Sequence, residues 1–206
     1  MTSRRDQHQR DVARFDAWSQ RYDRSWLQRV FFGPVHAHVI AVAEKAVPQA
    51  RTVLDVGCGT GRLLQRLAQA YPTARLVGVD AAAGMALVAV RRHRIAAVVG
   101  VAEQLPFRIG SVQLLVSTIS MHHWGDQRRG LAEIRRVLAP GGLLLLTDPI
   151  VTGWLRPFFV VGRARDRFHT AAELDVMLGD AGLRATHRSP VPGMWGAVAV
   201  TVAVPT

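Results

Sequence analysis

The sequence predicts an α/β fold with one seven-stranded, mostly parallel sheet and helices on both faces. Five short apolar segments alternate with helical patterns between residues 52 and 147. Such alternation is typical of parallel strands that are buried on both faces. Two more apolar segments follow near the C-terminus, and we expect the last strand to be antiparallel. The length of 206 residues suits a single domain over 1–206.

The first 50 residues are expected to form an N-terminal helical extension that caps the domain. Apolar residues at helical spacing predict an amphipathic helix over 11–28. A second helix is expected over 34–47, because Pro34 suits a first helical turn and Pro48 follows its end. Three aromatic side chains are expected to pack mainly on the face of the first helix: Trp18, Tyr22 and Trp26.

Residues 51–147 are expected to form the ligand-binding core, in which strands alternate with helices. The strands are expected at Thr52–Val56, Arg75–Val79, Ile95–Gly100, Val112–Ser117 and Leu143–Thr147. The helices between them are expected over 62–70, 82–93 and 127–138. The last helix should stop at the turn sequence Ala139-Pro140-Gly141-Gly142.

Residues 148–206 begin with a long connection, 148–169, which contains several prolines and glycines. Connections of this length are uncommon unless they cover or bind something, so we expect a lid segment. A helix over 170–181 and an antiparallel strand pair, about 183–189 and 197–204, complete the fold. Three aromatic residues of the connection either line an apolar pocket or simply bury the loop: Trp154, Phe158 and Phe159.

Composition limits the classes of function. The formal charge is +11, but Lys45 is the one lysine among 26 Lys and Arg residues, and the arginines are spread along the chain. This pattern indicates compositional bias more than a nucleic-acid surface. Cys58 is the one cysteine, which excludes an internal disulfide. With no signal peptide and no apolar run near the roughly 20 residues of a spanning helix, we expect a soluble, cytoplasmic protein, although peripheral membrane contact stays open.

Three glycines, Gly57, Gly59 and Gly61, alternate directly after the first expected strand. Ligands of open parallel sheets bind beyond the carboxyl ends of the strands, where this loop lies. The loop lacks the lysine of a P-loop, and Arg62 replaces the third glycine of the dinucleotide fingerprint. Asp55, two residues before the loop, suits an ammonium or sulfonium group better than a pyrophosphate. The pattern therefore favours a cationic, non-phosphorylated nucleoside.

The stretch Val53–Gly61 resembles motif I of the class I S-adenosylmethionine (SAM)-dependent methyltransferases. Three further segments resemble that family in the same order: Leu76–Asp80, Glu103–Phe107 and Arg136–Gly142. Phe15-Asp16-Ala17-Trp18 and Tyr22-Asp23 resemble the ubiquinone/menaquinone-biosynthesis-type small-molecule branch. The resemblance implies a Rossmann-like fold, with SAM as cofactor and S-adenosylhomocysteine (SAH) as its product.

The resemblance also implies a cofactor site. The glycine loop would wrap the methionine part of SAM, with Asp55 near its amino group. Asp80 would accept from the ribose hydroxyls, although an aspartate there could instead cap the next helix. The implied cofactor-binding residues are Tyr22, Asp55, Gly57, Cys58, Gly59, Gly61, Asp80, Ala81, Ala102, Glu103 and Ser117.

Two residues depart from the family pattern. Val101 stands where relatives often carry an aspartate that can accept from the adenine amino group. Gln113 stands where the fourth strand usually has an aspartate. Cys58 is expected to pack beside the cofactor rather than to act as a nucleophile, because the sequence places no base next to it.

His122 and His123 follow the fourth strand, where substrate is expected. Histidine can act as a general base near neutral pH, so both are candidate catalytic residues, with His122 preferred. The alternative is a packed or hydrogen-bonded histidine pair. We expect no metal site, since adjacent histidines point in different directions and no spaced ligand set accompanies them.

The resemblance implies in-line methyl transfer from SAM to an O, N or C atom of a small, hydrophobic or aromatic molecule. RNA methylation is an alternative suggested by the charge, although no N/D-P-P-Y/W tetrad follows the fourth strand. A non-catalytic protein that binds SAM or a partner is the other alternative. The expected partner is thus a small-molecule acceptor, nucleic acid is not favoured, and the oligomeric state is not predicted.

Overall fold

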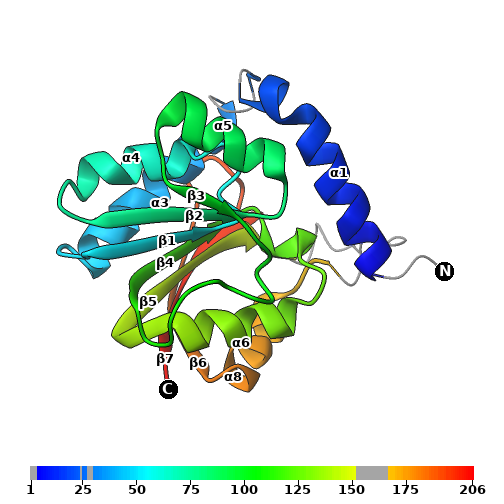
Figure 1. Ribbon diagram of the computed structural model, residues 1–206. Coiled ribbons are helices and arrows are strands. Elements are labelled where there is room, and N and C mark those ends of the chain that lie inside the picture. Colours follow the sequence, from blue (N-terminus) through cyan, green and yellow to red (C-terminus); the bar gives the residue numbers. More distant parts are fainter. Residues whose placement is uncertain (1–3, 24, 27–29, 152–166) are drawn as a thin grey trace.

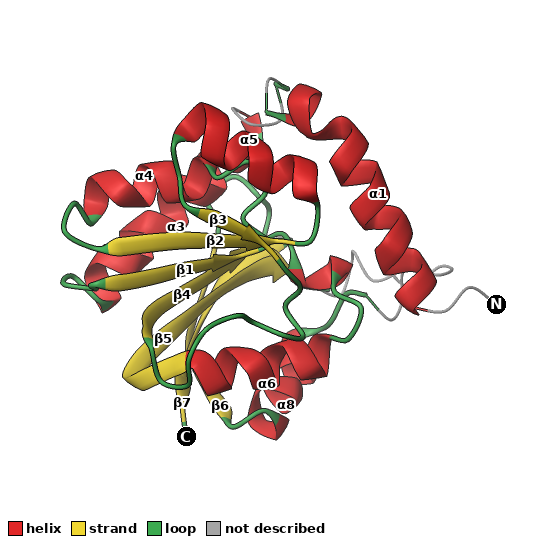
Figure 2. Ribbon diagram, viewed as in Figure 1, coloured by secondary structure: helices red, strands yellow, loops and turns green. Residues whose placement is uncertain are grey.

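The computed structural model describes residues 1–206 except 1–3, 24, 27–29 and 152–166. A central sheet lies between two layers of helices (Figures 1 and 2). One face is covered by α3 (Phe32–Ala46), α4 (Arg62–Ala70) and α5 (Ala83–His93). The other face is covered by α6 (Gln127–Val137) and α8 (Ala171–Asp180).

The sheet has seven strands in the order β3-β2-β1-β4-β5-β7-β6. Their bounds are β1 Thr52–Val56, β2 Arg75–Asp80, β3 Ala97–Val99, β4 Val112–Thr118, β5 Leu138–Pro149, β6 Leu183–Pro190 and β7 Val198–Pro205. Strands β1 to β5 pair in parallel, whereas β7 is antiparallel to both β5 and β6. The predicted seven-stranded, Rossmann-like sheet with an antiparallel last strand is confirmed.

The strand order reverses beside β1, which lies between β2 and β4. In such sheets the loops that follow the strands on either side of the reversal diverge and leave a crevice for a ligand. The loop after β1, the end of β2 and the segment after β4 therefore meet at one edge of the sheet.

The core consists of two apolar clusters, one on each face of the sheet. Neighbouring residues of β4 point to opposite faces: Leu115 packs in the cluster with Ile134 of α6, and Leu114 packs in the cluster with Leu64 of α4. All four side chains are fully buried. This two-sided burial explains why the strands are continuous apolar runs without alternation.

The N-terminal helix differs from the expected one. Helix α1 spans Arg4–Tyr22, so it begins earlier and ends earlier than the predicted range 11–28. It packs across α5 at Gly84, where an added Cβ would lie 2.8 Å from the backbone oxygen of Asp16. Trp26 lies beyond the helix and is 69% exposed, so its expected packing on the helix face is wrong.

Strand β5 is longer than predicted, because the turn sequence before it belongs to the strand. The pairing of β4 with β5 shifts between Val112↔Leu138 and Leu114↔Leu143, which accommodates the extra residues as an irregularity. Gly142 is required there, since an added Cβ would lie 2.9 Å from the carbonyl oxygen of Val112. Strand β3 is shorter than expected, and a short 3-10 helix, η1 (Met121–His123), follows β4.

Trp154, Phe158 and Phe159 lie outside the described residues, so their expected role in an apolar pocket remains a prediction. Within the described part of the chain, no helix combines the length and the apolar character needed to cross a membrane.

Candidate functional site

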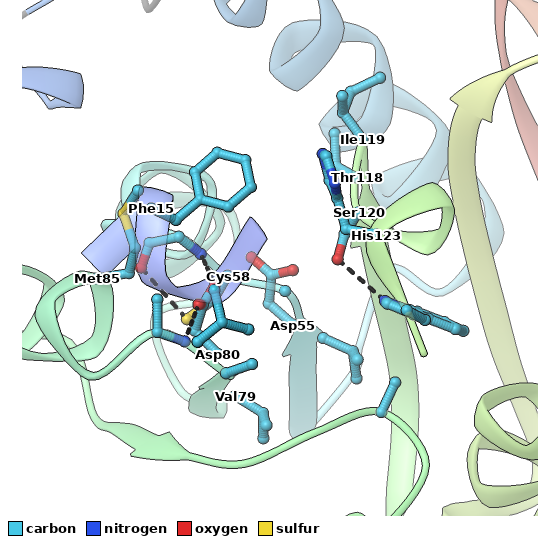
Figure 3. Close-up of a pocket in the computed structure, with 18 of the residues that line it drawn as sticks. Phe15, Asp55, Cys58, Val79, Asp80, Met85, Thr118, Ile119, Ser120 and His123 are labelled. Carbon is cyan, nitrogen blue, oxygen red and sulfur yellow. Dashed lines mark hydrogen bonds between the residues drawn. The ribbon is translucent and has the colours of Figure 1, made fainter. Parts of the chain in front are cut away.

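A cavity of about 980 Å³, counting its open mouth, lies at the carboxyl edge of β1, β2 and β4. Its floor is formed by the loops that follow these strands, and α1 and the start of α3 supply further walls. Figure 3 shows Asp80 and Cys58 on one side and Thr118 and Ser120 on the other, with the Asp55 carboxylate between them. The cavity is therefore at the place where the fold leaves room for a ligand.

The glycine loop after β1 adopts a conformation that only glycine accepts easily. Gly57, Gly59 and Gly61 have φ values of +77°, +54° and +81°. An added Cβ on Gly57 would lie 1.8 Å from the Ser120 hydroxyl, so the loop packs tightly against the segment after β4. Around Gly59 there is open space, and this residue lines the cavity. The loop thus brings backbone directly to a ligand.

Asp80, at the end of β2, holds the glycine loop in place. One carboxylate oxygen accepts from Gly59 N at 2.8 Å and the other accepts from Ala82 N at 2.9 Å. The N-cap of α5 is Ala82, with no side-chain cap, so Asp80 is not the capping residue of that helix. Each carboxylate oxygen can accept a second hydrogen bond, which leaves capacity for ligand hydroxyls.

Asp55 is a buried carboxyl group at the end of β1. Burial, and then the nearby Asp80 charge, raise its pKa to about 8. The pKa of Asp80 is also raised by burial. Two carboxyl groups in one poorly hydrated cavity favour a ligand that brings positive charge, because such a ligand stabilises their ionised forms. This electrostatic character fits a sulfonium and an ammonium group.

Cys58 lines the cavity as a packed thiol. Burial, followed by the charges of Asp55 and Asp80, raises its pKa well above the usual value. Gly78 of β2 makes room for it, since an added Cβ would lie 2.5 Å from the Cys58 sulfur. The thiol therefore stays protonated at neutral pH and is a poor nucleophile.

Most of the predicted cofactor-binding residues lie around this cavity. Those that line it are Tyr22, Asp55, Gly57, Cys58, Gly59, Asp80, Ala81, Ala102 and Glu103. Gly61 does not line it and instead packs against α5, where an added Cβ would lie 2.9 Å from the Ala89 Cβ. Ser117 is fully buried within β4 and also stands back from the cavity.

The two residues that depart from the family pattern lie in different places. Val101 lines the cavity, next to Ala102. Gln113 lies at the start of β4, where its side-chain oxygen accepts from Arg51 N at 2.7 Å and its own N donates to Thr52 Oγ1 at 2.9 Å. Gln113 therefore ties β4 to β1 at the edge of the sheet opposite the cavity.

The two candidate catalytic histidines were expected to point in different directions, but their ring centroids lie 4.0 Å apart. His123 lines the cavity, whereas His122 does not. The Nδ1 atom of His122 is 2.6 Å from Asp148 Oδ1, and its ring stacks on Phe168. Among the residues that the structure describes, no group of three or more potential metal ligands is found. Of the two residues, His123 is the one that lines the main cavity, and both line a smaller pocket beside it.

His123 is held by charged neighbours. Its Nδ1 lies 2.8 Å from Asp11 Oδ2 and 2.6 Å from Arg167 Nη2, so only Nε2 is left for a ligand. Burial, and then the charge of His122, lower the pKa of His123 to about 4 in spite of Asp11. The ring is therefore neutral near pH 7 in the ligand-free protein.

Several cavity residues were not predicted from the sequence. Among them are the aromatic residues Phe15 of α1 and Phe32 of α3. Their ring centroids lie 6.3 and 5.8 Å from that of the predicted residue Tyr22. Ile119 lines the cavity with φ +52°, an unusual conformation for a β-branched residue. Other unpredicted lining residues are His8, Asp11, His36, Arg62, Thr118, Ser120 and Trp124. They come from segments that only the folded chain brings together.

The strand order, the glycine loop and the paired acids are those predicted for a Rossmann-like fold that binds a nucleoside at this edge of the sheet. Residues 53–142 match the family model described as a methyltransferase domain. A solved SAM-dependent methyltransferase from Aquifex aeolicus shares the fold, with a TM-score of 0.73, 18% identity, and coverage of 93% of this chain and 98% of that chain. Residues 53–142 are therefore similar to a methyltransferase domain, and the chain shares the fold of that solved enzyme.

Two methyltransferases with different named acceptors are similar in sequence to this chain. A malonyl-[acyl-carrier protein] O-methyltransferase from Geobacter sulfurreducens is 46% identical over 149 residues, 65% of this chain and 55% of that protein. A ubiquinone/menaquinone biosynthesis C-methyltransferase from Syntrophotalea carbinolica is 31% identical over 155 residues, 69% of this chain and 65% of that protein. The aligned chain thus spans less than two thirds of the length of these relatives.

Proposed function

We propose that this protein transfers the methyl group of SAM to a small, hydrophobic or aromatic molecule. One observation carries the proposal: a single cavity combines a buried acidic part, formed by Asp55 and Asp80, with an aromatic part formed by rings of α1 and α3. The acidic part suits a cationic nucleoside, and the aromatic part suits an apolar acceptor beside it. The relatives named above act on different acceptors, so they support the reaction class more than any one substrate.

The cofactor half of the proposal rests on the fit between the residues present and SAM. Asp80 would accept from the ribose hydroxyls, and Asp55 would face the ammonium group. Gly57 and Gly59 would let the methionine part approach the backbone, and Ala102 and Glu103 would lie beside the adenine. The remaining predicted residues, Gly61 and Ser117, would support the loop and strand from behind. When bound, SAM supplies a methyl group on a positively charged sulfur.

The chain contributes mainly positioning and exclusion of water. Asp55, Asp80 and the glycine loop would hold SAM so that it supplies the methyl carbon to the acceptor atom, and its sulfur would keep the electron pair of the carbon–sulfur bond. Holding two reactants in line can supply about 7–11 kcal/mol of the barrier reduction. When the acceptor carries a proton, that proton must leave, and Nε2 of His123 is the candidate acceptor of the pair; His122 would act only indirectly.

The proposal extends to the whole chain as one catalytic domain. Residues 1–50 would cap the site, 51–147 would bind the cofactor, and 148–206 would complete the sheet and the acceptor side. A cytoplasmic location and a small-molecule acceptor, rather than nucleic acid, belong to the same proposal. Its basis is the lone, buried Cys58 and the two carboxyl groups of the cavity, Asp55 and Asp80, which suit a cationic ligand better than a phosphodiester backbone.

Methyl transfer is tested with SAM that carries a labelled methyl group, offered with a panel of quinols, phenols and N-heterocycles. We expect label in an organic-extractable product for at least one acceptor class, and none with Asp80→Ala. A parallel reaction with bulk RNA serves as the control for the alternative acceptor. Label in RNA but in no small molecule would contradict the proposal.

A further inference from the structure

His36 is a buried polar side chain that the proposed reaction does not use. It lies on α3, is 7% exposed, and lines the same cavity as Asp55 and Asp80. Its ring lies against the ring of Phe32, at a centroid distance of 5.8 Å. Among the described residues, no hydrogen bond to its ring nitrogens is found. Buried polar groups are normally hydrogen-bonded, so an imidazole of this kind at a cavity wall indicates a ligand partner.

The surroundings of His36 limit the charge of that partner. Burial, followed by the charges of Arg66 and Arg62, lowers the pKa of His36 to about 3. The ring is therefore uncharged near pH 7 and offers one N–H donor and one nitrogen acceptor. The two arginines disfavour a cationic partner. The guanidinium of Arg62, which also lines the cavity, is already paired with Asp23, with 2.7 Å between Nε and Oδ1.

The neighbouring wall is aromatic. Phe32 contacts both His36 and Tyr22, and Phe31 packs on Phe32 at 5.1 Å. Edge-to-face contacts among these rings leave aromatic surface toward the cavity, which suits a flat apolar body. An uncharged hydroxyl group on such a body can donate to one imidazole nitrogen or accept from the other.

Resting on the proposed function, we propose that His36 is a specificity-determining residue that hydrogen-bonds a phenolic hydroxyl of the methyl acceptor. The acceptor class is thus an uncharged, aromatic alcohol whose ring lies against Phe32 and Tyr22. His36 binds and orients this hydroxyl and is distinct from His123, which lies on η1.

The test uses thymol and para-cymene, two ring compounds that differ by one hydroxyl, with protein saturated in SAH. We expect the wild-type protein to prefer thymol by about fivefold to tenfold in equilibrium dialysis, the worth of one hydrogen bond. The variant H36F should lose this preference, and H36Q should keep part of it. His38 lies on the same helix and pairs with Ser189 at 2.9 Å outside the cavity, so H38F is the matched control and should keep the preference.

SAH affinity, measured by calorimetry on each variant, separates this inference from the proposed function. We expect H36F to bind SAH as the wild-type protein does. An unchanged thymol preference in H36F, no thymol binding by the SAH-saturated wild type, or a large loss of SAH affinity in H36F would each overturn the inference. In the last case His36 would belong to the cofactor side. Failure of the wild type to bind SAH at all would instead overturn the proposed function.

Discussion

At the scale of single residues, the buried carboxyl group of Asp55 lowers the stability of the ligand-free protein when it ionises. Its pKa of about 8 lies above the unfolded value of 3.8, because burial and Asp80 disfavour the ionised form. The folded protein therefore holds a proton that the unfolded chain has released. Stability from this group is present below the unfolded pKa and is lost as the pH rises toward 8. A bound cationic ligand would instead favour the ionised form of Asp55, because its positive charge stabilises the carboxylate.

Asp55→Asn should therefore stabilise the ligand-free protein at about pH 8, with a difference from the wild type that shrinks toward about pH 5. The same variant should bind SAM at least about tenfold more weakly, because it cannot carry the negative charge. Thermal unfolding across this pH range, together with calorimetric titration, measures both effects.

The control for this prediction is Asp180→Asn, which changes an exposed carboxyl group paired with Arg128 on the surface. It should leave both the pH dependence and the SAM affinity unchanged. A stability difference for Asp55→Asn that stays constant between the two pH values would contradict the assignment of the raised pKa to this residue.

The sequence identified Asp55, Asp80 and the glycine loop because each occupies a fixed place in a local pattern. His36 and Asp11 carry no such pattern, and nothing in their neighbourhood marks them as cavity residues. Their positions depend on how α1 and α3 pack over the sheet, a tertiary event that local spacing does not encode. For the same reason, the sequence could not tell which of His122 and His123 faces the cavity.

At the scale of elements, the docking of α1 depends on Asp23 at its C-terminal end. This buried carboxylate accepts from Arg62 Nε at 2.7 Å, Arg92 Nη1 at 2.7 Å and His93 Nε2 at 2.9 Å. Burial acts to raise the pKa of Asp23, but the hydrogen bonds from Arg92, Arg62 and His93 outweigh it and hold the pKa well below its usual range. The cluster joins α1 to the start of α4 and the end of α5.

Asp23→Ala should destabilise the protein by about 1.5–3 kcal/mol, because it removes the buried acceptor of hydrogen bonds from two partly exposed arginines and from His93. SAM affinity should fall as well, since Arg62 and Tyr22 both line the cavity. Hydrogen exchange should speed up in α1 before the sheet opens, and mass spectrometry of α1 peptides measures this.

Asp175→Ala is the matched control, because it breaks an exposed pair with Arg188 and should cost at most about 1 kcal/mol. Equal destabilisation by the two substitutions would contradict the role of Asp23. So would unchanged exchange in α1 when Asp23 is replaced.

Element boundaries were predictable where local signals and packing agree. Strand β1 and helix α4 have the predicted bounds, since the apolar run and the glycine loop define both. Strand β5 was predicted too short, because Ala139–Gly142 has turn composition yet pairs in the sheet. Helix α1 was predicted too far toward the C-terminus, because the chain leaves the helix where Asp23 meets its arginine partners.

At the scale of the whole molecule, segments from both halves of the chain meet at the cavity mouth. Asp11 of α1 accepts from Arg167, near the end of the connection 148–169, and also contacts His123 of η1. Arg167 in turn donates to the backbone oxygen of His122 at 2.8 Å. The cavity is lined by the acids Asp55 and Asp80, although the formal charge of the whole chain is +11. The total charge of the chain therefore does not predict the charge of the site.

The fold class and the position of the site followed from the order of strands, loops and acids along the chain. The proposed acceptor side did not, because the cavity residues assigned to it come from α1, α3 and the segment after β4, which are distant in sequence. Under the proposed function, recognition of an acceptor would depend on that assembled surface, whereas recognition of a nucleoside would depend on one loop and one strand end.

Calorimetric titration of the full chain with SAM is the measurement on which this interpretation of the molecule depends. We predict saturable one-to-one binding to the wild-type protein. For Asp80→Ala we predict an affinity at least about a hundredfold weaker, with circular dichroism that still reports a folded protein. Absence of binding by folded wild-type protein, or equal affinity in the variant, would contradict the assignment of the cavity as a SAM site.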